Sequence, residues 1–286
     1  MPPGNLMYRR FYNLTRYPFE LGPDPFFFYA TPSHKEVLVN LVYGIQRHKG
    51  FIAVTGEVGT GKTLLVHCLL ELLRRTSVPF VYVMNPQLSS SELIHYLLEY
   101  LKLPPYETPK SEGLSRLHRY LVEQYRLGLT CALVVDEAHL LSWKLLEEIR
   151  LLGNLETTRH KLLQVVLIGQ PELDRKIDSP GCRQVKQRVS LRCHLSALNE
   201  EETRKYIVRR LELAGANSTA QDIFSAEAIA AIYQYSRGIP RVVNSICENA
   251  LIVGYSCQAR CIGLDLVEEV SGSLHLPSPH KYEVAV

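Results

Sequence analysis

Short runs of β-branched and other apolar residues alternate with longer amphipathic stretches from about residue 51 to residue 194. Such alternation is typical of βαβ units, in which parallel strands form a sheet and the intervening helices cover it. The predicted strands, in chain order, are 51–55, 80–84, 132–135, 165–168 and 189–194. The pattern therefore predicts an α/β fold with an open, parallel, five-stranded sheet sandwiched by helices.

Strand patterns stop near residue 199, and apolar residues then recur at helical spacing. The helices that this spacing predicts are 200–213, 226–235, 241–255 and 264–270, and an earlier helix is predicted at about 34–48. We therefore expect an α/β domain over residues 50–196, a small all-helical domain over 197–271, and a loose tail over 272–286.

The first fifty residues are rich in aromatic residues and prolines, as in Tyr17-Pro18-Phe19. Disordered tails are poor in aromatic residues. We therefore expect residues 1–49 to form an ordered arm and a helix that pack on the α/β domain.

Composition and charge narrow the functional classes. A hydrophobic content of 46% and a charged content of 21% exclude a disordered or fibrous protein, and the net charge of +3 argues against strong general attraction to nucleic acid or anionic membrane. No apolar run approaches the roughly 18 residues that span a bilayer, and the start of the chain lacks the pattern of a secretory signal. Seven scattered cysteines fit reduced structural thiols. We expect a cytoplasmic protein without an integral membrane segment.

A glycine-rich segment follows the first predicted strand and precedes a helical run over residues 64–75. It has the spacing G-x-x-x-x-G-K-T, in which backbone NH groups and the helix amino terminus bind phosphate. Lys62 is expected to reach the β and γ phosphates of ATP, and the Thr63 hydroxyl to bind Mg²⁺. A chance glycine-rich turn is the alternative, and the order of strand, loop and helix argues against it. The predicted nucleotide-binding residues of this segment are Gly56, Glu57, Val58, Gly59, Thr60, Gly61, Lys62, Thr63 and Leu64.

Two adjacent acids, Asp136 and Glu137, follow the third predicted strand. Carboxylates at the end of a buried strand are costly unless they bind metal or titrate. Asp136 is expected to hold Mg²⁺ and belongs with the nucleotide-binding residues, whereas Glu137 would orient and activate the attacking water. A solvated turn is the alternative. The pair favours hydrolysis over kinase-type transfer, which needs no general base here.

These two segments, the Gly169-Gln170 end of the fourth strand and the segment Gly238-Ile239-Pro240-Arg241 together resemble the AAA+ ATPases. From about residue 11 to residue 251, the chain more narrowly resembles the A-type ATPases of the general secretion pathway and their relatives beside exopolysaccharide or exosortase loci. The phrases that carry this narrower resemblance are Phe11-Tyr-x-Leu, Pro18-Phe19, Pro23-Asp24-Pro25, Pro32-Ser33-His34-x-Glu36, Leu155-Glu156-Thr157 and Gly169-Gln170-Pro171-Glu172-Leu173. The resemblance implies that the helical domain is a lid.

The resemblance also implies two polar contacts near the γ phosphate. Gln170 occupies the position of the first sensor, which contacts the γ phosphate or the attacking water; the alternative is that it caps the following helix. Asn85, at the end of the second strand, could hold Glu137 away from water until a partner binds. A turn with Pro86 explains Asn85 equally well.

Three arginines receive roles from the same resemblance. Arg188, just before the fifth strand, is the first candidate for an arginine that enters the neighbouring subunit's nucleotide site, with Arg183 as the competing candidate. The alternative for both is ordinary surface charge in a basic stretch that could also meet nucleic-acid phosphates. Arg241 starts a lid helix and is expected to make lid closure sensitive to ATP versus ADP.

The function that these features indicate is Mg²⁺-dependent ATP hydrolysis by a homo-oligomer, as a ring or a nucleotide-dependent assembly. It would work with a protein partner of a secretion, exopolysaccharide or envelope-assembly system, and that partner would supply any attachment to the inner membrane. The alternative is a nucleotide-dependent nucleic-acid adaptor resembling origin-recognition or transposition-helper ATPases. Residues 197–286 carry eight basic and eleven acidic side chains, a net charge of −3, which disfavours a lid that binds DNA.

Overall fold

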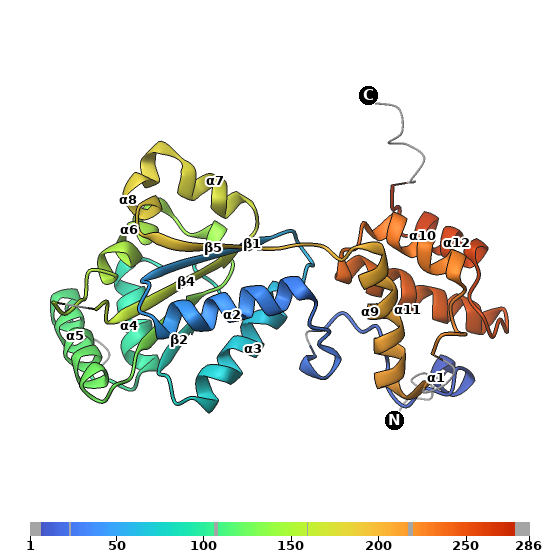
Figure 1. Ribbon diagram of the computed structural model, residues 1–286. Helices are drawn as coiled ribbons and strands as arrows, with labels where there is room; N and C mark the ends of the chain where they lie inside the picture. The colour runs from blue at the N-terminus through green and yellow to red at the C-terminus, as the bar shows by residue number, and fades with distance from the viewer. Residues whose placement is uncertain (1–6, 23, 106–107, 159, 217–219, 278–286) are drawn as a thin grey trace. The chain divides into compact units, whose positions relative to one another are not determined.

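The computed structural model describes residues 7–22, 24–105, 108–158, 160–216 and 220–277. Contacts within the chain divide it into two units (Figure 1). The sheet unit contains residues 32–57 and 62–195. The helical unit contains the described residues up to Thr31, residues 58–61, and the described residues from Ser196 onward.

Five parallel strands form the sheet, in the spatial order β2-β3-β4-β1-β5. Their bounds are β1 Phe51–Gly56, β2 Phe80–Val83, β3 Cys131–Val135, β4 Leu163–Gly169 and β5 Val189–Leu195. All five predicted strands are present, and the predicted α/β class with a parallel sheet is confirmed.

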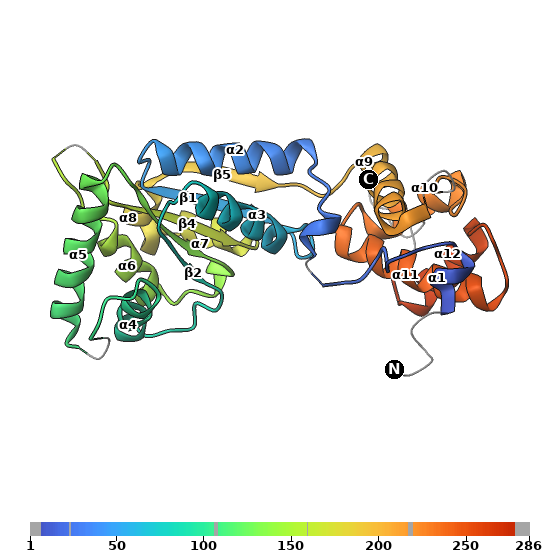
Figure 2. The ribbon, with the colours of Figure 1, turned by 90° about the horizontal axis from the view of Figure 1, so that it is seen from below.

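Helices cover both faces of this sheet (Figure 2). Along β1, Ile52 and Val54 face the cluster formed with α2 (Pro32–Gln46) and α3 (Lys62–Arg75), whereas Phe51 and Ala53 face the opposite cluster. This alternation is the two-residue period of a strand buried on both faces. The opposite cluster is built from α4 Ser90–Tyr100, α5 Lys110–Arg126, α6 Trp143–Leu152, α7 Glu172–Asp178 and α8 Arg183–Lys186.

The strand order brings three sequence-distant strand ends to one edge of the sheet. Near their carboxyl ends, β3 and β4 pair through Val135 and Leu167, and β1 and β4 pair through Thr55 and Gly169. Because β1 lies between β4 and β5, the connection after β1 leaves the sheet at a point where the strand order reverses. Ligands of open α/β sheets bind outside the carboxyl ends of the strands at such points.

The helical unit consists of short helices around its own apolar core. Its helices in the second half of the chain are α9 Glu200–Leu211, the π-helical turn Glu212–Ala216, α10 Ala226–Ser236, α11 Pro240–Ser256 and α12 Leu264–Ser273. Asn199 caps α9 through a capping box with Glu202, and Pro240 opens α11. Gly238 has φ +69° between α10 and α11, and a Cβ there would lie 1.8 Å from the Leu198 carbonyl oxygen. Only glycine fits this turn.

The N-terminal arm packs on the helical unit, contrary to the prediction from sequence that it packs on the α/β domain. The Tyr8 hydroxyl lies 2.8 Å from both carboxylate oxygens of Glu248, and the Tyr12 hydroxyl donates to the Ala259 carbonyl at 2.8 Å. Phe19 is fully buried and lies edge-on to Phe224, with ring centroids 6.3 Å apart. The apolar residues of the arm pack against these helices, and of the described residues up to position 49, those in the sheet cluster belong to α2.

Replacing Phe19 with alanine is therefore expected to destabilise the helical unit, by about 3 to 5 kcal/mol for a buried phenylalanine. The measurement is hydrogen exchange of the α9 and α11 amides, which should lose protection. Phe26→Ala, at a position 46% exposed in the same arm, is the matched control and should cost much less. Lost protection in the sheet unit, with α9 and α11 unchanged, would contradict this assignment of the arm.

Within the described residues, no helix has both the length and the apolar character needed to cross a bilayer. Pro23 and the tail residues 278–286, which the sequence analysis names, lie outside the described residues.

Candidate functional site

The phosphate-binding loop connects β1 to α3 at the carboxyl edge of the sheet. Two of its glycines have positive φ, +84° at Gly59 and +98° at Gly61, a backbone conformation that other residues adopt at a cost. Lys62 is the first residue of α3, and Thr63 and Leu64 follow in its first turn. The described loop therefore has the strand–loop–helix context that phosphate binding requires.

The Lys62 side chain folds back to the start of the loop. Its ammonium donates to the carbonyl oxygens of Gly56 and Glu57, each at 2.8 Å, and the residue is 7% exposed. Burial lowers the pKa of Lys62, and the negative charges of Glu137 and Asp136 oppose that shift. The amine is thus fixed beside the loop and close to the acidic pair.

Asp136 extends from the end of β3 and is 4% exposed. Its Oδ1 accepts the Glu137 amide at 2.8 Å, and its Oδ2 accepts the Tyr82 hydroxyl at 3.2 Å. Burial raises the pKa of Asp136, and Lys62 acts in the opposite direction. A cation at this carboxylate would favour its ionised form.

Glu137 leaves the strand in the left-handed backbone region, with φ 48° and ψ 35°. Its side chain is 40% exposed, and its Oε2 lies 3.4 Å from Nδ1 of His139. That oxygen is itself buried and accepts no hydrogen bond from the described residues. The carboxylate is therefore close to a possible donor without being hydrogen-bonded to it.

The donor chemistry at this edge suits Mg²⁺. A threonine hydroxyl at Thr63 and a carboxylate at Asp136 are hard oxygen ligands, which Mg²⁺ prefers. Among the described residues no three His, Cys, Asp or Glu side chains gather into a metal cluster.

Gln170 and Asn85 have different surroundings. Gln170 directly follows β4, and its backbone NH donates to His139 Nδ1 at 3.4 Å. Helix α7 takes Pro171 as its N-cap, without a side-chain cap bond. Asn85 is exposed, and its Oδ1 accepts the Gln87 amide at 3.1 Å, which is the turn around Pro86; none of the described hydrogen bonds joins it to Glu137.

The two candidate trans-acting arginines differ in exposure. Arg188 is half-buried, and its guanidinium donates to the Arg150 carbonyl at a long 3.4 Å. Arg183, in α8, is exposed beside a hollow of about 350 Å³ that Trp143 also lines. Both guanidinium groups are on the sheet unit, and neither is fixed by a short bond among the described contacts.

Arg241 is the second residue of α11, and its side chain is exposed. Its backbone NH donates to the Gly59 carbonyl at 3.2 Å, within the helical unit as the contacts define it. A Cβ at Gly59 would lie 2.7 Å from the Arg241 Cβ, so this contact also requires glycine.

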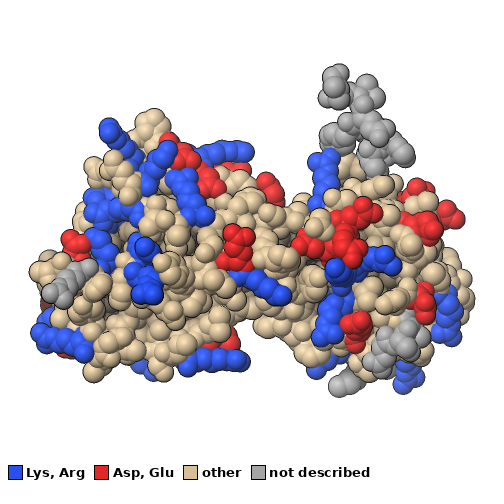
Figure 3. Space-filling view, in the orientation of Figure 1, with Lys and Arg blue, Asp and Glu red and all other residues tan. Residues whose placement is uncertain are grey.

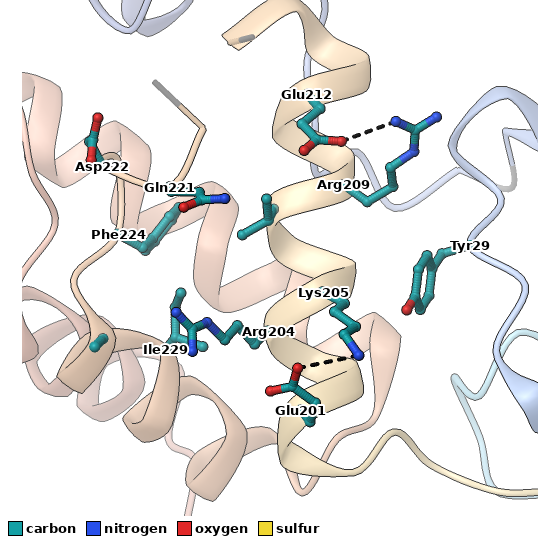
Figure 4. Close-up of a pocket in the computed structure, with 12 residues that line it drawn as sticks. Tyr29, Glu201, Arg204, Lys205, Arg209, Glu212, Gln221, Asp222, Phe224 and Ile229 are labelled. Carbon is teal, nitrogen blue, oxygen red and sulfur yellow. Dashed lines mark hydrogen bonds and ion pairs between the residues drawn. The ribbon is translucent and has the colours of Figure 1, made fainter. Parts of the chain in front are cut away.

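A cavity of about 580 Å³ in the helical unit contains none of the predicted site residues. It lies along the charged side of α9, and Phe224 and Ile229 form part of its other wall (Figure 4). Two of its cations are already paired, Lys205 with Glu201 at 3.3 Å and Arg209 with Glu212 at 3.0 Å. We do not assign the candidate chemistry to this cavity.

Three residues near the acidic pair were not predicted from sequence. His139 contacts both Glu137 and Gln170, and Tyr82 contacts Asp136. Lys176 donates to the carbonyls of His139 at 2.5 Å and Leu141 at 2.6 Å. A histidine two positions after Glu137 is the sequence signal that could have revealed His139. No motif indicated Tyr82 or Lys176.

Comparison with known proteins yields one domain family and one relative of high similarity. The family model for an AAA domain matches residues 45–177. General secretion pathway protein A of Aeromonas hydrophila is 40% identical over 254 residues, which cover 87% of this chain and 45% of that protein. The chain thus spans less than half the length of this relative.

Solved structures support the fold. Cdc6p of Pyrobaculum aerophilum matches with a TM-score of 0.63 and 17% identity, over 93% of this chain and 70% of that one. The Drosophila ORC structure bound to DNA matches with a TM-score of 0.60 and 17% identity, over 98% of this chain and 69% of that one. At such identities the similarity concerns the fold alone.

Proposed function

We propose that the chain, which matches the family model of an AAA domain over residues 45–177 and is similar to general secretion pathway protein A, binds ATP with Mg²⁺ and hydrolyses it. The observation that carries this proposal is the meeting of two motifs at one edge of the sheet. The phosphate loop follows β1, and the acidic pair Asp136-Glu137 follows β3. The amine of Lys62 lies close enough to both acids for their charges to oppose the lowering of its pKa.

Each residue in this proposal has a distinct task. The loop amides and Lys62 bind the phosphates, and Thr63 and Asp136 hold Mg²⁺, which neutralises charge on the phosphate oxygens. Glu137 accepts the proton of the attacking water, and Gln170 contacts the γ phosphate or that water. Asn85 remains a weaker candidate, because its side chain already serves a turn.

Assembly and lid movement form the second part of the proposal. Arg188, or Arg183 in its place, enters the nucleotide site of a neighbouring copy, where a permanent planar charge binds phosphate oxygens. Arg241 contacts the terminal phosphate and makes the position of the helical lid depend on ATP versus ADP. The 40% identity to a general secretion pathway protein supports work for a secretion or envelope system. In this proposal, a protein partner supplies any attachment to the inner membrane.

The alternative, a nucleotide-dependent nucleic-acid adaptor, receives less support from the surface charge. In the basic stretch before and within β5, Lys186 pairs with Asp178 at 3.0 Å, and Arg192 pairs with the same carboxylate at 3.0 Å. On the face that Figure 3 shows, basic side chains are scattered among acidic and neutral ones. Such neutralised cations release fewer counterions from nucleic acid than free ones do.

Replacing Lys62 with alanine tests the first step. Removing a charge-assisted hydrogen bond costs a factor of about ten to a hundred, so ATP and ADP should both bind at least that much more weakly. The measurement is equilibrium binding of a fluorescent ATP analogue in Mg²⁺. Lys35→Ala, an exposed lysine on α2, is the matched control and should bind like the wild type.

Equal ATP affinity for the two lysine variants would exclude the proposed phosphate contact of Lys62. Wild-type protein that binds ATP but releases no phosphate at any concentration would exclude hydrolysis and favour the adaptor.

A further inference from the structure

We propose that His139 is a positioning residue that directs Glu137 and links it to the end of β4. His139 lies in the short 3₁₀ turn Ala138–Leu140 that directly follows the acidic pair. The inference rests on the proposed function, because it assigns His139 an effect on the proposed general base. It concerns a side chain that neither the phosphate loop nor the acidic pair includes.

One ring nitrogen of His139 faces two groups. Nδ1 lies 3.4 Å from Glu137 Oε2 and 3.4 Å from the backbone nitrogen of Gln170. The His139 side chain is only 11% exposed, so water competes little for this nitrogen. The nitrogen therefore forms a bridge between the carboxylate and the first peptide after β4.

The two contacts exclude each other chemically. A nitrogen that accepts the Gln170 NH uses its lone pair and carries no proton, whereas donation to Glu137 requires that proton. When Nδ1 accepts from Gln170, Oε2 of Glu137 faces a lone pair and is left without a donor, as is the case for this buried oxygen among the described bonds. When Nδ1 carries a proton, it can donate that proton in a hydrogen bond to Oε2 and hold the Glu137 carboxylate in one orientation.

The backbone of the turn that carries His139 is held in place by neighbouring residues. The Lys176 ammonium binds the His139 and Leu141 carbonyls, and thereby clamps the turn to α7. Gly169 provides the space, because a Cβ there would lie 3.1 Å from the His139 backbone nitrogen and 3.3 Å from Nδ1. The backbone that carries the ring is therefore held beside the end of β4.

A consequence follows for coupling within the sheet unit. The side chain of Gln170 is the proposed contact to the γ phosphate. A shift of the Gln170 backbone weakens the hydrogen bond that its NH donates to His139 Nδ1. Once Nδ1 has taken up a proton, from water or by exchange of the proton on Nε2, it can donate to Glu137 Oε2. The orientation of the Glu137 carboxylate therefore depends on what Gln170 contacts.

The test compares two substitutions of His139 in the full chain. In His139→Asn, the amide places an oxygen or a nitrogen near the position of Nδ1 and can accept or donate. In His139→Leu, both abilities are lost. We expect His139→Leu to lower kcat about tenfold to a hundredfold, the effect of one hydrogen bond to a charged group, with KM for ATP and ATP affinity unchanged. His139→Asn should recover most of that loss, and His118→Leu, at an exposed position on α5, should match the wild type.

The second arm places each substitution in the Glu137→Gln background. Because His139 acts through Glu137, His139→Leu should reduce the residual turnover of Glu137→Gln no further. A full additional loss would overturn the inference, as would an equal loss of ATP affinity in His139→Leu and His139→Asn, which would show a purely structural role. Wild-type turnover in His139→Leu would overturn it while leaving the proposed hydrolysis intact. Absent hydrolysis in the wild type would contradict the proposed function itself.

Discussion

Glutamine in place of Glu137 is expected to give a protein that binds ATP and retains it without hydrolysis. The amide keeps the size of the side chain but cannot accept the proton of the attacking water. General base catalysis contributes about a hundredfold to ten-thousandfold to a rate, so steady-state phosphate release should fall by that factor. The nucleotide affinity should stay near the wild-type value, because Lys62 and the loop amides remain.

The measurements are phosphate release and the nucleotide bound per protein after gel filtration. Glu123→Gln, an exposed position on α5, is the matched control and should hydrolyse normally. Wild-type turnover by Glu137→Gln would remove Glu137 from the role of base and direct attention to another group at this edge.

Mixtures of two inactive variants are expected to regain ATP turnover. In an assembly, Arg188→Ala subunits offer an intact phosphate site, and Lys62→Ala subunits offer an intact arginine. An arginine that acts on a neighbour's nucleotide contributes about a thousandfold or more in related phosphoryl-transfer systems. Each variant alone should therefore be nearly inactive, and the mixture should recover a substantial fraction of the wild-type rate. The rate of ATP turnover per wild-type subunit should also rise with protein concentration, because assembly increases.

The same mixing experiment with Arg183→Ala distinguishes the two candidates. Arg188 stands immediately before β5, whereas Arg183 is the more exposed. Recovery with Arg183→Ala, but normal activity of Arg188→Ala alone, would assign the role to Arg183. Arg175→Ala, an exposed arginine whose nearest carboxylate is 3.6 Å away, is the control for general loss of positive charge. Assembly of each variant is checked by light scattering.

Much of the sheet unit could be predicted from sequence, because parallel strands buried on both faces form continuous apolar runs. The predicted 51–55 agrees to within one residue with β1, which is buried throughout. The predicted 189–194 agrees equally well with β5, an edge strand in which apolar and polar residues alternate. The arm could not be placed in this way. Its aromatic residues indicate that it packs, but the partner of Tyr8 is more than two hundred residues away, and no local pattern contains that information.

The candidate site likewise has parts that could be predicted from sequence and parts that could not. The phosphate loop and the acidic pair were evident because their chemistry depends on residues close together in sequence. The contact between His139 and Gln170 depends instead on the register of β3 beside β4, which places the segments after Val135 and Gly169 next to each other. Asn85 accepts the Gln87 amide in the turn around Pro86, which is one of the two uses that the sequence left open for this side chain.

The packing of the arm has a consequence for the order in which the chain is synthesised. Tyr8 and Glu248 are 240 positions apart, and Tyr12 and Ala259 are 247 apart. On the ribosome, the arm emerges before the residues that it contacts, and the intervening sheet unit can already fold in the interval. Phe19 therefore remains uncovered until Phe224 and the helices around it have been made. Of the two units, the helical unit therefore completes its core after the sheet unit has been made.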